Sequence, residues 1–225
     1  MTIGIIAAMS KELQLLLPLL QDSEMIQVGE MTFHRGKMGG HDVVAMQCGI
    51  GKVNAAIGVL TLINHFNPQY VINSGVAGGA DTSVNVMDVV AGARVAYHDV
   101  WCGPESLVGQ VQGLPLYFEG ARQLLDLLPE RDGIHQGLIC SGDQFIDTYE
   151  TLEKIKNNFP DALALDMESG SIAQVCHLCH VPFLALRVIS DSPGAGHDNT
   201  QQYLDFWSDA PRESFELIKD IIINL

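Results

Sequence analysis

The chain has 225 residues, 47% of them hydrophobic, and Asp plus Glu outnumber Lys plus Arg by 27 to 12, which gives a net charge of −15. This length fits one α/β domain with a sizeable core. Because the sequence contains no basic cluster, we expect neither a nucleic acid nor an anionic membrane as a partner.

The N-terminal residues and the cysteines indicate the cellular compartment of the protein. Met1–Ile6 carries no basic leader, so it predicts a first β-strand and not a signal peptide, and no stretch approaches the roughly 18 apolar residues of a membrane span. Five cysteines, an odd number, favour reduced thiols. We therefore expect a cytoplasmic protein without disulfides.

Short apolar runs alternate with longer segments of helical period, which is typical of βαβ units. In chain order the predicted elements are strand Ile3–Ala7, helix Lys11–Leu20, a hairpin within Met25–Met38 with turn signals at Gly29 and Gly36, strand Val43–Gln47, helix Lys52–Phe66, strand Tyr70–Asn73, strand Met87–Gly92, helix Ala121–Leu128, strand Gly137–Cys140, helix Thr148–Asn158, strand Ala162–Asp166, helix Glu168–His180, strand Phe183–Ile189 and helix Ala210–Ile223. The hairpin makes the sheet mixed. No repeat or linker interrupts the pattern, so we predict a single domain over residues 1–225, of the α/β class, with a central mixed twisted sheet flanked by helices.

Acidic residues follow three of the apolar runs. Glu12 follows the first strand, Glu168 follows Ala162–Leu165, and Asp191 follows Phe183–Ile189. Because the carboxyl ends of strands in an open parallel sheet face one crevice, this spacing predicts three carboxyl groups in one site. Taken singly, Glu12 also fits an ordinary first-turn helix residue, and Asp191 fits a turn.

Arg187 lies inside the last apolar run. A buried guanidinium is costly without a partner, so its position predicts a nearby carboxylate or bound anion. Together with the acidic residues it favours an acid/base site over isolated structural roles.

Three other patterns carry weaker signals. Cys176–His180 has the spacing of a haem attachment or of half a zinc site, but no second ligand pair exists, and core packing is the better interpretation. Gly49–Lys52 and Gly75–Gly79 follow strands but lack the spacing of a triphosphate loop or of a dinucleotide fingerprint. We therefore predict no metal and no cofactor, and interpret both loops as backbone that a ligand can approach closely.

Seven segments together resemble one known family. They are Ile3–Met9 with Glu12, Gly49–Ala56, Asn73–Gly79, Tyr97–Asp99, Ser141–Ile146, Asp166–Glu168 and Arg187–Asp191. In this order they resemble the 5′-methylthioadenosine/S-adenosylhomocysteine nucleosidases, within the family of purine nucleoside phosphorylases and uridine phosphorylases. The resemblance covers nearly the whole chain and implies a nucleoside phosphorylase-like fold and a small adenosine-type nucleoside as substrate.

The resemblance also implies a role for each matching residue. Asp191, oriented by Ser190, would protonate the imidazole-ring nitrogen of adenine, and Glu12, with Arg187 nearby, would be the general base on water. Glu168 would hold the ribose hydroxyls. The remaining positions would line the substrate: Phe145, Ile146 and Met167 at the purine, Met9 and Ile50 at the ribose and alkylthio side, Val76 and Asp166 near the water or ribose, and Tyr203 or Phe206 closing over the adenosine.

Physical chemistry is consistent with opposite roles for Asp191, as the acid, and Glu12, as the base. Two acids with opposite roles need environments that separate their proton affinities. We expect desolvation to raise the pKa of Asp191, and Arg187 to favour the ionised form of Glu12.

Hydrolysis is favoured over phosphorolysis. A phosphorylase holds a phosphate dianion, usually with several arginines, but the chain has only six arginines and none between Ala7 and Glu12. Three alternatives stay open: a related nucleosidase of futalosine or AMP type, a nucleoside phosphorylase, and a non-catalytic nucleoside-binding module.

The chain departs from the family pattern at several positions. Val76 stands where many relatives carry Ser, and Asp166 replaces the more common Glu. The segment after Asp99 also differs, as does the Gly- and Pro-containing loop over Ser192–Asn199. In this family Val100–Gln110 often comes from a neighbouring subunit, so the resemblance implies a homodimer.

Overall fold

Ten strands form one mixed sheet in the part of the chain that the structure, a computed structural model, describes, namely residues 1–193, 199–207 and 212–225, with the backbone alone for 212–214. The strands are β1 (Thr2–Ala7), β2 (Gln21–Val28), β3 (Met31–Met38), β4 (His41–Gln47), β5 (Tyr70–Gly79), β6 (Val89–Tyr97), β7 (Phe118–Glu119), β8 (Ile134–Ser141), β9 (Ala162–Asp166) and β10 (Phe183–Asp191). The helices are α1 (Ser10–Leu16), the 3₁₀ helix η1 (Leu17–Leu19), α2 (Lys52–Phe66), α3 (Arg122–Leu125), α4 (Tyr149–Asn158), α5 (Ser169–Cys179), α6 (Asn199–Phe206) and α7 (Arg212–Asn224).

The sheet closes on itself around β5. Its order is β10-β6-β8-β9-β5-β1-β4-β3-β2, and β10 also pairs with β5, so that β10, β6, β8, β9 and β5 form a ring. β10 runs parallel to β5. β9 runs antiparallel to β5 and pairs only with the last two residues of β5, Gly78 and Gly79. The ends of β9, β5 and β10 therefore meet at one place.

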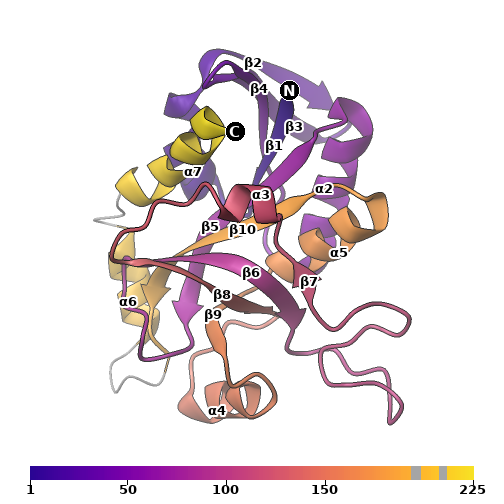
Figure 1. Ribbon diagram of the computed structural model, residues 1–225, viewed down its shortest axis with the longest axis vertical. Helices are drawn as coiled ribbons and strands as arrows, with labels where there is room; N and C mark the ends of the chain where they lie inside the picture. Colours follow the sequence, from indigo (N-terminus) through magenta and orange to yellow (C-terminus); the bar gives the residue numbers. More distant parts are fainter. Residues whose placement is uncertain (194–198, 208–211) are drawn as a thin grey trace.

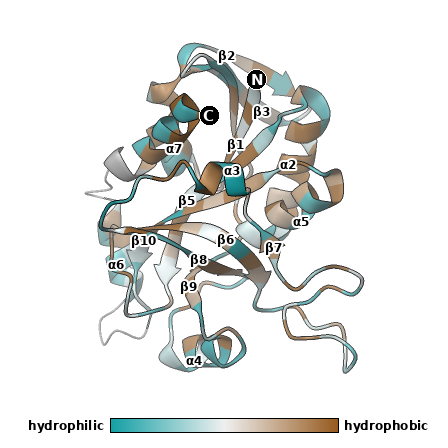
Figure 2. Cartoon of the chain, viewed as in Figure 1, coloured by the Kyte–Doolittle hydropathy of each residue, from teal (hydrophilic) through white to brown (hydrophobic). Residues whose placement is uncertain are grey.

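Helices cover both faces of the sheet. α2 packs on α5 on one side, and α1 packs on α7 on the other (Figure 1). Figure 2 shows brown, hydrophobic segments on α2 and α7, and each of these helices buries part of its apolar side chains in the core, such as Val59 and Leu62 of α2 and Ile218 and Ile221 of α7. All nine residues of β10 are buried, and this burial on both faces explains why its apolar residues, Phe183–Leu186, Val188 and Ile189, do not alternate with exposed polar ones. The predicted α/β fold with a mixed, helix-flanked sheet is confirmed.

Several predicted boundaries are wrong. The first helix ends at Leu16 and continues as η1, which contains Pro18, a residue without an N–H to donate. Gly75–Gly79 is not a loop but the second half of β5, and Gly36 lies inside β3, whereas Gly29 does lie at the hairpin turn with φ of 57°. Part of the predicted Ser192–Asn199 loop, residues 194–198, and the predicted start of the last helix, residues 210–211, lie outside the described residues.

Two elements were missed by the sequence analysis, namely β7 and α6. β7 is only two residues long, and α6 lacks a strong apolar period, since Asn199 and Phe206 are its two buried residues. Among the described residues, no helix combines the length and the apolar character that crossing a bilayer would need.

Candidate active site

A cavity of about 340 Å³ opens where β5, β9 and β10 end beside the start of α1. Of the predicted site residues, all but Arg187 and Phe206, the alternative to Tyr203, line it. They are Met9, Glu12, Ile50, Val76, Phe145, Ile146, Asp166, Met167, Glu168, Ser190, Asp191 and Tyr203. The sequence prediction that three carboxyl groups share one site is confirmed.

Glu12 is held by backbone N–H groups from the turn between β1 and α1 and from β5. Its Oε2 accepts hydrogen bonds from the N–H groups of Ala8 and Met9, both at 2.9 Å, and its Oε1 accepts one from Val76 at 3.1 Å. Burial raises the pKa of Glu12, while these three donors and the charge of Arg187 act in the opposite direction. A buried carboxyl that the protein holds ready as an acceptor suits a general base. Since Val76 contributes its backbone N–H here, the Val in place of Ser preserves this contact.

Asp191 closes β10 and has a different environment. The Ser190 hydroxyl donates to its Oδ1 at 2.7 Å, and the Asn199 side-chain amide donates to its Oδ2 at 3.1 Å. Burial is the largest influence and raises the pKa of Asp191, as predicted, although both hydrogen bonds oppose the shift. Among the described residues no Lys or Arg is hydrogen-bonded to this carboxyl. The environment therefore favours a proton held on Asp191.

Glu168 lies between the other two carboxyls in sequence and reaches the cavity from the end of β9. Its Oε1 accepts the Gly51 N–H at 2.9 Å, at the start of α2. Burial, followed by the negative charge of Asp166, raises the pKa of Glu168 to about 7, while Arg187 and the Gly51 N–H act in the opposite direction. This carboxyl therefore changes its charge near neutral pH.

Arg187 does not line the cavity but lies behind it, 1% exposed. Its Nε and Nη2 contact Asp166 Oδ2 at 2.7 and 2.5 Å, its Nη1 donates to the Asn73 carbonyl at 3.2 Å, and its Nη2 donates to the Asn73 side-chain oxygen. The predicted carboxylate partner is thus Asp166, which confirms that a buried guanidinium at this position requires one. Asn73 was not predicted, and the strand pattern alone contains no signal for it.

The rest of the cavity wall is apolar and aromatic. The rings of Phe145 and Tyr203 lie 5.7 Å apart at 67°, and the Tyr203 hydroxyl lies 3.4 Å from the Met9 sulfur. Of the two aromatic residues considered for closing over a ligand, Tyr203 lines the cavity, whereas Phe206 is buried in the core between α6 and the sheet. A flat heterocycle could pack between Phe145 and Met167 on this wall.

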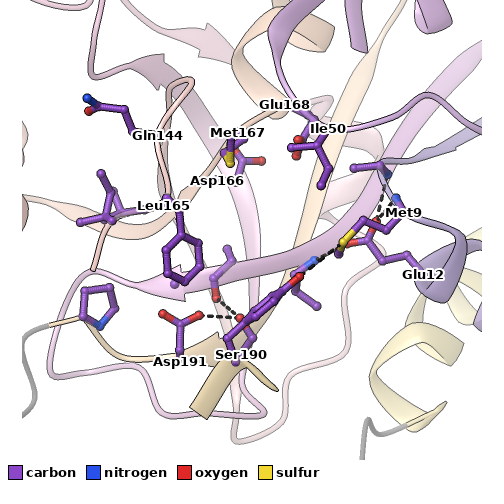
Figure 3. A pocket seen from close by; sticks show the side chains of 18 residues that line it. Met9, Glu12, Ile50, Gln144, Leu165, Asp166, Met167, Glu168, Ser190 and Asp191 are labelled. Atoms are coloured by element: carbon purple, nitrogen blue, oxygen red, sulfur yellow. Dashed lines mark hydrogen bonds between the residues drawn. The ribbon is translucent and has the colours of Figure 1, made fainter. Parts of the chain in front are cut away.

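The acidic side chains are separated within the cavity. Figure 3 shows Asp191 and Ser190 on one side, Glu12 with Met9 on the other, and Glu168 beside Ile50. Among the described residues that line the cavity, none is Lys or Arg. The arrangement can deliver a proton at one end and accept one at the other, with negative charge between them, but it offers no cationic side chain to an anion.

The cysteine pattern of α5 belongs to the core. Cys176 is buried against the sheet, and Cys179 packs at the edge of the same cluster. Within the described ranges, no three His, Cys, Asp or Glu side chains gather as metal ligands.

Known proteins resemble this chain over its whole length. Residues 2–223 match the phosphorylase superfamily. A 5′-methylthioadenosine/S-adenosylhomocysteine nucleosidase of Desulfotalea psychrophila is 42% identical over 199 residues, 85% of this chain and 84% of that protein. The nucleosidase of the same name from Staphylococcus haemolyticus is 38% identical over 226 residues, 98% of each.

A solved structure agrees with these relatives. The crystal structure of S-adenosylhomocysteine nucleosidase from Streptococcus pyogenes in complex with 5-methylthiotubericidin superposes with a TM-score of 0.94 at 35% identity, covering 100% of this chain and 97% of that one. Fold, cavity and sequence identity agree, and the chain therefore belongs to the phosphorylase superfamily and, within it, to the 5′-methylthioadenosine/S-adenosylhomocysteine nucleosidases.

Proposed function

We propose that this chain hydrolyses the N-glycosidic bond of 5′-methylthioadenosine and S-adenosylhomocysteine, releasing adenine and the 5-thioribose product. The observation that carries the proposal is the pair of carboxyls on opposite sides of one cavity, Asp191 and Glu12, with Glu168 also in the wall and no cationic side chain among the described lining residues. Residues 1–225 act as one nucleosidase domain.

In this mechanism Asp191 delivers a proton to the imidazole-ring nitrogen of adenine as the bond to the anomeric carbon breaks and its electron pair moves into the base. A raised pKa keeps Asp191 protonated until that step. Glu12 accepts a proton from the water whose oxygen bonds the anomeric carbon on the opposite face. Glu168 holds the ribose hydroxyls, and its charge favours the cationic character of the sugar in the transition state.

Arg187 acts from behind the cavity in this proposal. Its charge favours the ionised forms of both Glu12 and Glu168. It is not available to a phosphate ion because Asp166 and Asn73 occupy its donors. Hydrolysis is therefore favoured over phosphorolysis.

The test is adenine release from 5′-methylthioadenosine with and without phosphate. We expect release without phosphate, reduced by about 10² to 10⁴ in Asp191→Asn and in Glu12→Gln. Asp205→Asn, the same exchange at an exposed position of α6, serves as the matched control and should retain the wild-type rate.

Each alternative predicts another result. Dependence on phosphate would identify a nucleoside phosphorylase. Turnover of futalosine or AMP in preference to methylthioadenosine would identify a related nucleosidase, and binding without turnover of any nucleoside would leave a binding module.

The enzyme further acts as a homodimer in this proposal. α2 exposes a row of apolar side chains at helical spacing, Val53, Ile57 and Leu60, with Val53 70% exposed. The segment after Asp99 exposes Trp101, and the contact of Lys52 Nζ with Asp99 at 2.5 Å joins the start of α2 to that segment. Sedimentation velocity should give a dimer for the wild type and a monomer for a Val53→Asp, Ile57→Asp variant; a wild-type monomer would contradict the proposal.

The cellular role follows from the resemblance. Removal of methylthioadenosine in the cytoplasm would serve methionine salvage. Cell fractionation and growth on methylthioadenosine as the sulfur source test these two statements.

A further inference from the structure

One side-chain amide bridges the two groups that would face adenine. The Asn199 Nδ2 donates to Asp191 Oδ2 and to the Ile146 carbonyl, both at 3.1 Å. An amide nitrogen has two hydrogens, so it can make both bonds at once. Asn199 is the first residue of α6 and was not among the predicted site residues.

Asn199 does not line the cavity. It is 4% exposed, whereas its two partners, Asp191 and Ile146, both line the cavity. Its contacts with the site therefore pass through Asp191 and Ile146.

The relative position of these two groups matters for the reaction. A purine bound in the cavity must present its imidazole-ring nitrogen to Asp191 while another edge meets the backbone of Ile146. Asp191 and Ile146 are 45 positions apart in the chain. The local backbone of one therefore does not fix the position of the other in space. A misplacement of about 1 Å can cost about 10² in rate.

We propose that Asn199 is a positioning residue, which fixes the general acid Asp191 relative to the adenine-reading backbone at Ile146. This proposal rests on the proposed nucleosidase function.

The partners on the two oxygens of Asp191 are not equivalent. The Ser190 hydroxyl lies 2.7 Å from Oδ1 and 3.3 Å from the Ala77 carbonyl. It can donate to an ionised Asp191, or accept from a protonated Oδ1 and donate to Ala77 instead. Asn199 only donates at Oδ2, so it favours the ionised form and opposes the effect of burial on the pKa of Asp191.

The charged neighbours of Asp191 are few among the described residues. Burial raises the pKa of Tyr203 of α6, and the negative charges of Glu12, Asp191 and Glu168 add to this effect. The acidic residues that share the cavity with Asp191 are Glu12, Asp166 and Glu168. The segments of β5 that pack against Asp191 contribute Ala77 and Gly78, which do not titrate. Removing the Asn199 donor should therefore move the titration of Asp191 upward without a cationic group to compensate.

The experiment compares Asn199→Ala and Asn199→Leu with Gln202→Ala in the full chain. Leu has the branched shape of Asn but no donor and no titrating group, so it removes the two bonds and roughly keeps the volume. Gln202 is the matched control because it is another amide of α6, and its Oε1 accepts the Ser192 N–H at 3.1 Å without touching Asp191. For each variant, kcat and KM for methylthioadenosine are measured as a function of pH.

We expect both Asn199 variants to lower kcat/KM by about 10-fold to 100-fold, mostly through kcat, because proton delivery belongs to the transition state. The alkaline limb of the profile should move to higher pH, and Gln202→Ala should leave both quantities unchanged. A uniform loss of activity at every pH, or wild-type activity in Asn199→Ala, would overturn the proposal. A thermal melt and adenine binding by calorimetry identify variants that lose activity through misfolding.

The parallel Asp191→Asn variant separates this proposal from the proposed function. If Asp191→Asn is active, the general-acid assignment itself is wrong. If Asp191→Asn is inactive and Asn199→Ala keeps the wild-type profile, only the positioning role is wrong.

Discussion

Glu12 and Gly75 approach so closely that a Cβ added at residue 75 would lie 2.8 Å from Oε1 of Glu12. The same Cβ would lie 3.4 Å from Nη1 of Arg187. Side-chain carbon atoms do not normally come within 3.0 Å of such neighbours, so the absent side chain of Gly75 leaves the space in which Glu12 meets β5.

Gly75→Ala should therefore displace Glu12, the general base of the proposed mechanism. We expect kcat to fall by about 10-fold to 100-fold while adenine binding stays close to the wild type, because the adenine-facing end of the cavity is not touched. Steady-state kinetics and calorimetry check the two parts. Gly137→Ala is the control, since the atoms nearest to its Cβ would all belong to the flexible Leu163 side chain. An equal loss in both variants would indicate a general effect on the strands.

The Asp166–Arg187 pair should be essential to stability. Asp166→Ala leaves a fully buried guanidinium without its carboxylate, and we expect a loss of about 3–5 kcal/mol in the free energy of unfolding. Urea denaturation measures this loss. The Asp166→Ala, Arg187→Met double variant should recover part of it, because the uncompensated charge is gone.

Two results would contradict this prediction. One is a small effect of Asp166→Ala, comparable to that of removing the exposed Glu150 from its pair with Lys154. The other is a double variant that is less stable than Asp166→Ala.

The acid limb of the activity profile should lie near neutral pH. Glu168 has a pKa raised to about 7, so its negative charge disappears as the pH falls through that value. In the proposed mechanism this charge favours the sugar cation, so kcat/KM of the wild type should fall below about pH 7. Glu168→Gln should be slower at every pH and should lack this limb. A wild-type profile that stays flat from pH 8 to pH 5 would be inconsistent with the role given to Glu168.

Stability should show the opposite trend with pH. The pKa of Glu168 is about 7 in the folded chain and 4.5 as its ordinary value, so the folded protein retains a proton that the unfolded chain loses. Its contribution is most favourable below pH 4.5 and is lost as the pH rises through 7. Glu168→Gln should thus stabilise the fold by roughly 1–3 kcal/mol at pH 8 and hardly at pH 4.5.

Thermal melts at the two pH values measure this difference. The Gln side chain keeps an oxygen for the Gly51 N–H, so the hydrogen bond at 2.9 Å is retained. Asp205→Asn, on the exposed side of α6, should show no such pH-dependent gain. An equal change in both variants would point to net charge as the cause.

Local patterns predicted most of the elements but not all of their limits. The spacing of apolar residues identified α2, α4 and α5 and the core strands, because an element that buries one face repeats its apolar residues with its own period. It did not identify α6, which has few buried side chains, and it took half of β5 for a loop because glycines favour loops when packing is unknown.

The prediction that Glu168 shares one site with Glu12 and Asp191 was correct, but the reason given for it was wrong. An open parallel sheet would place all three carboxyls on one edge, but β9 is antiparallel to β5. Glu168 reaches the cavity because β9 pairs only with the last two residues of β5, inside a sheet that closes into a ring. Strand direction and closure depend on contacts between distant segments, so the local sequence does not contain them.

The sequence by itself determined the fold class, the family and the residue types of the site, since these follow from apolar periodicity and from motifs that keep their order along the chain. The tertiary structure alone decided that Arg187 pairs with Asp166 behind the cavity, that Glu12 depends on the space beside Gly75, and that Asn199 joins Asp191 to Ile146. Hydrogen bonds and close contacts between segments far apart in the chain arise only when the sheet closes, and no local pattern of residues encodes them.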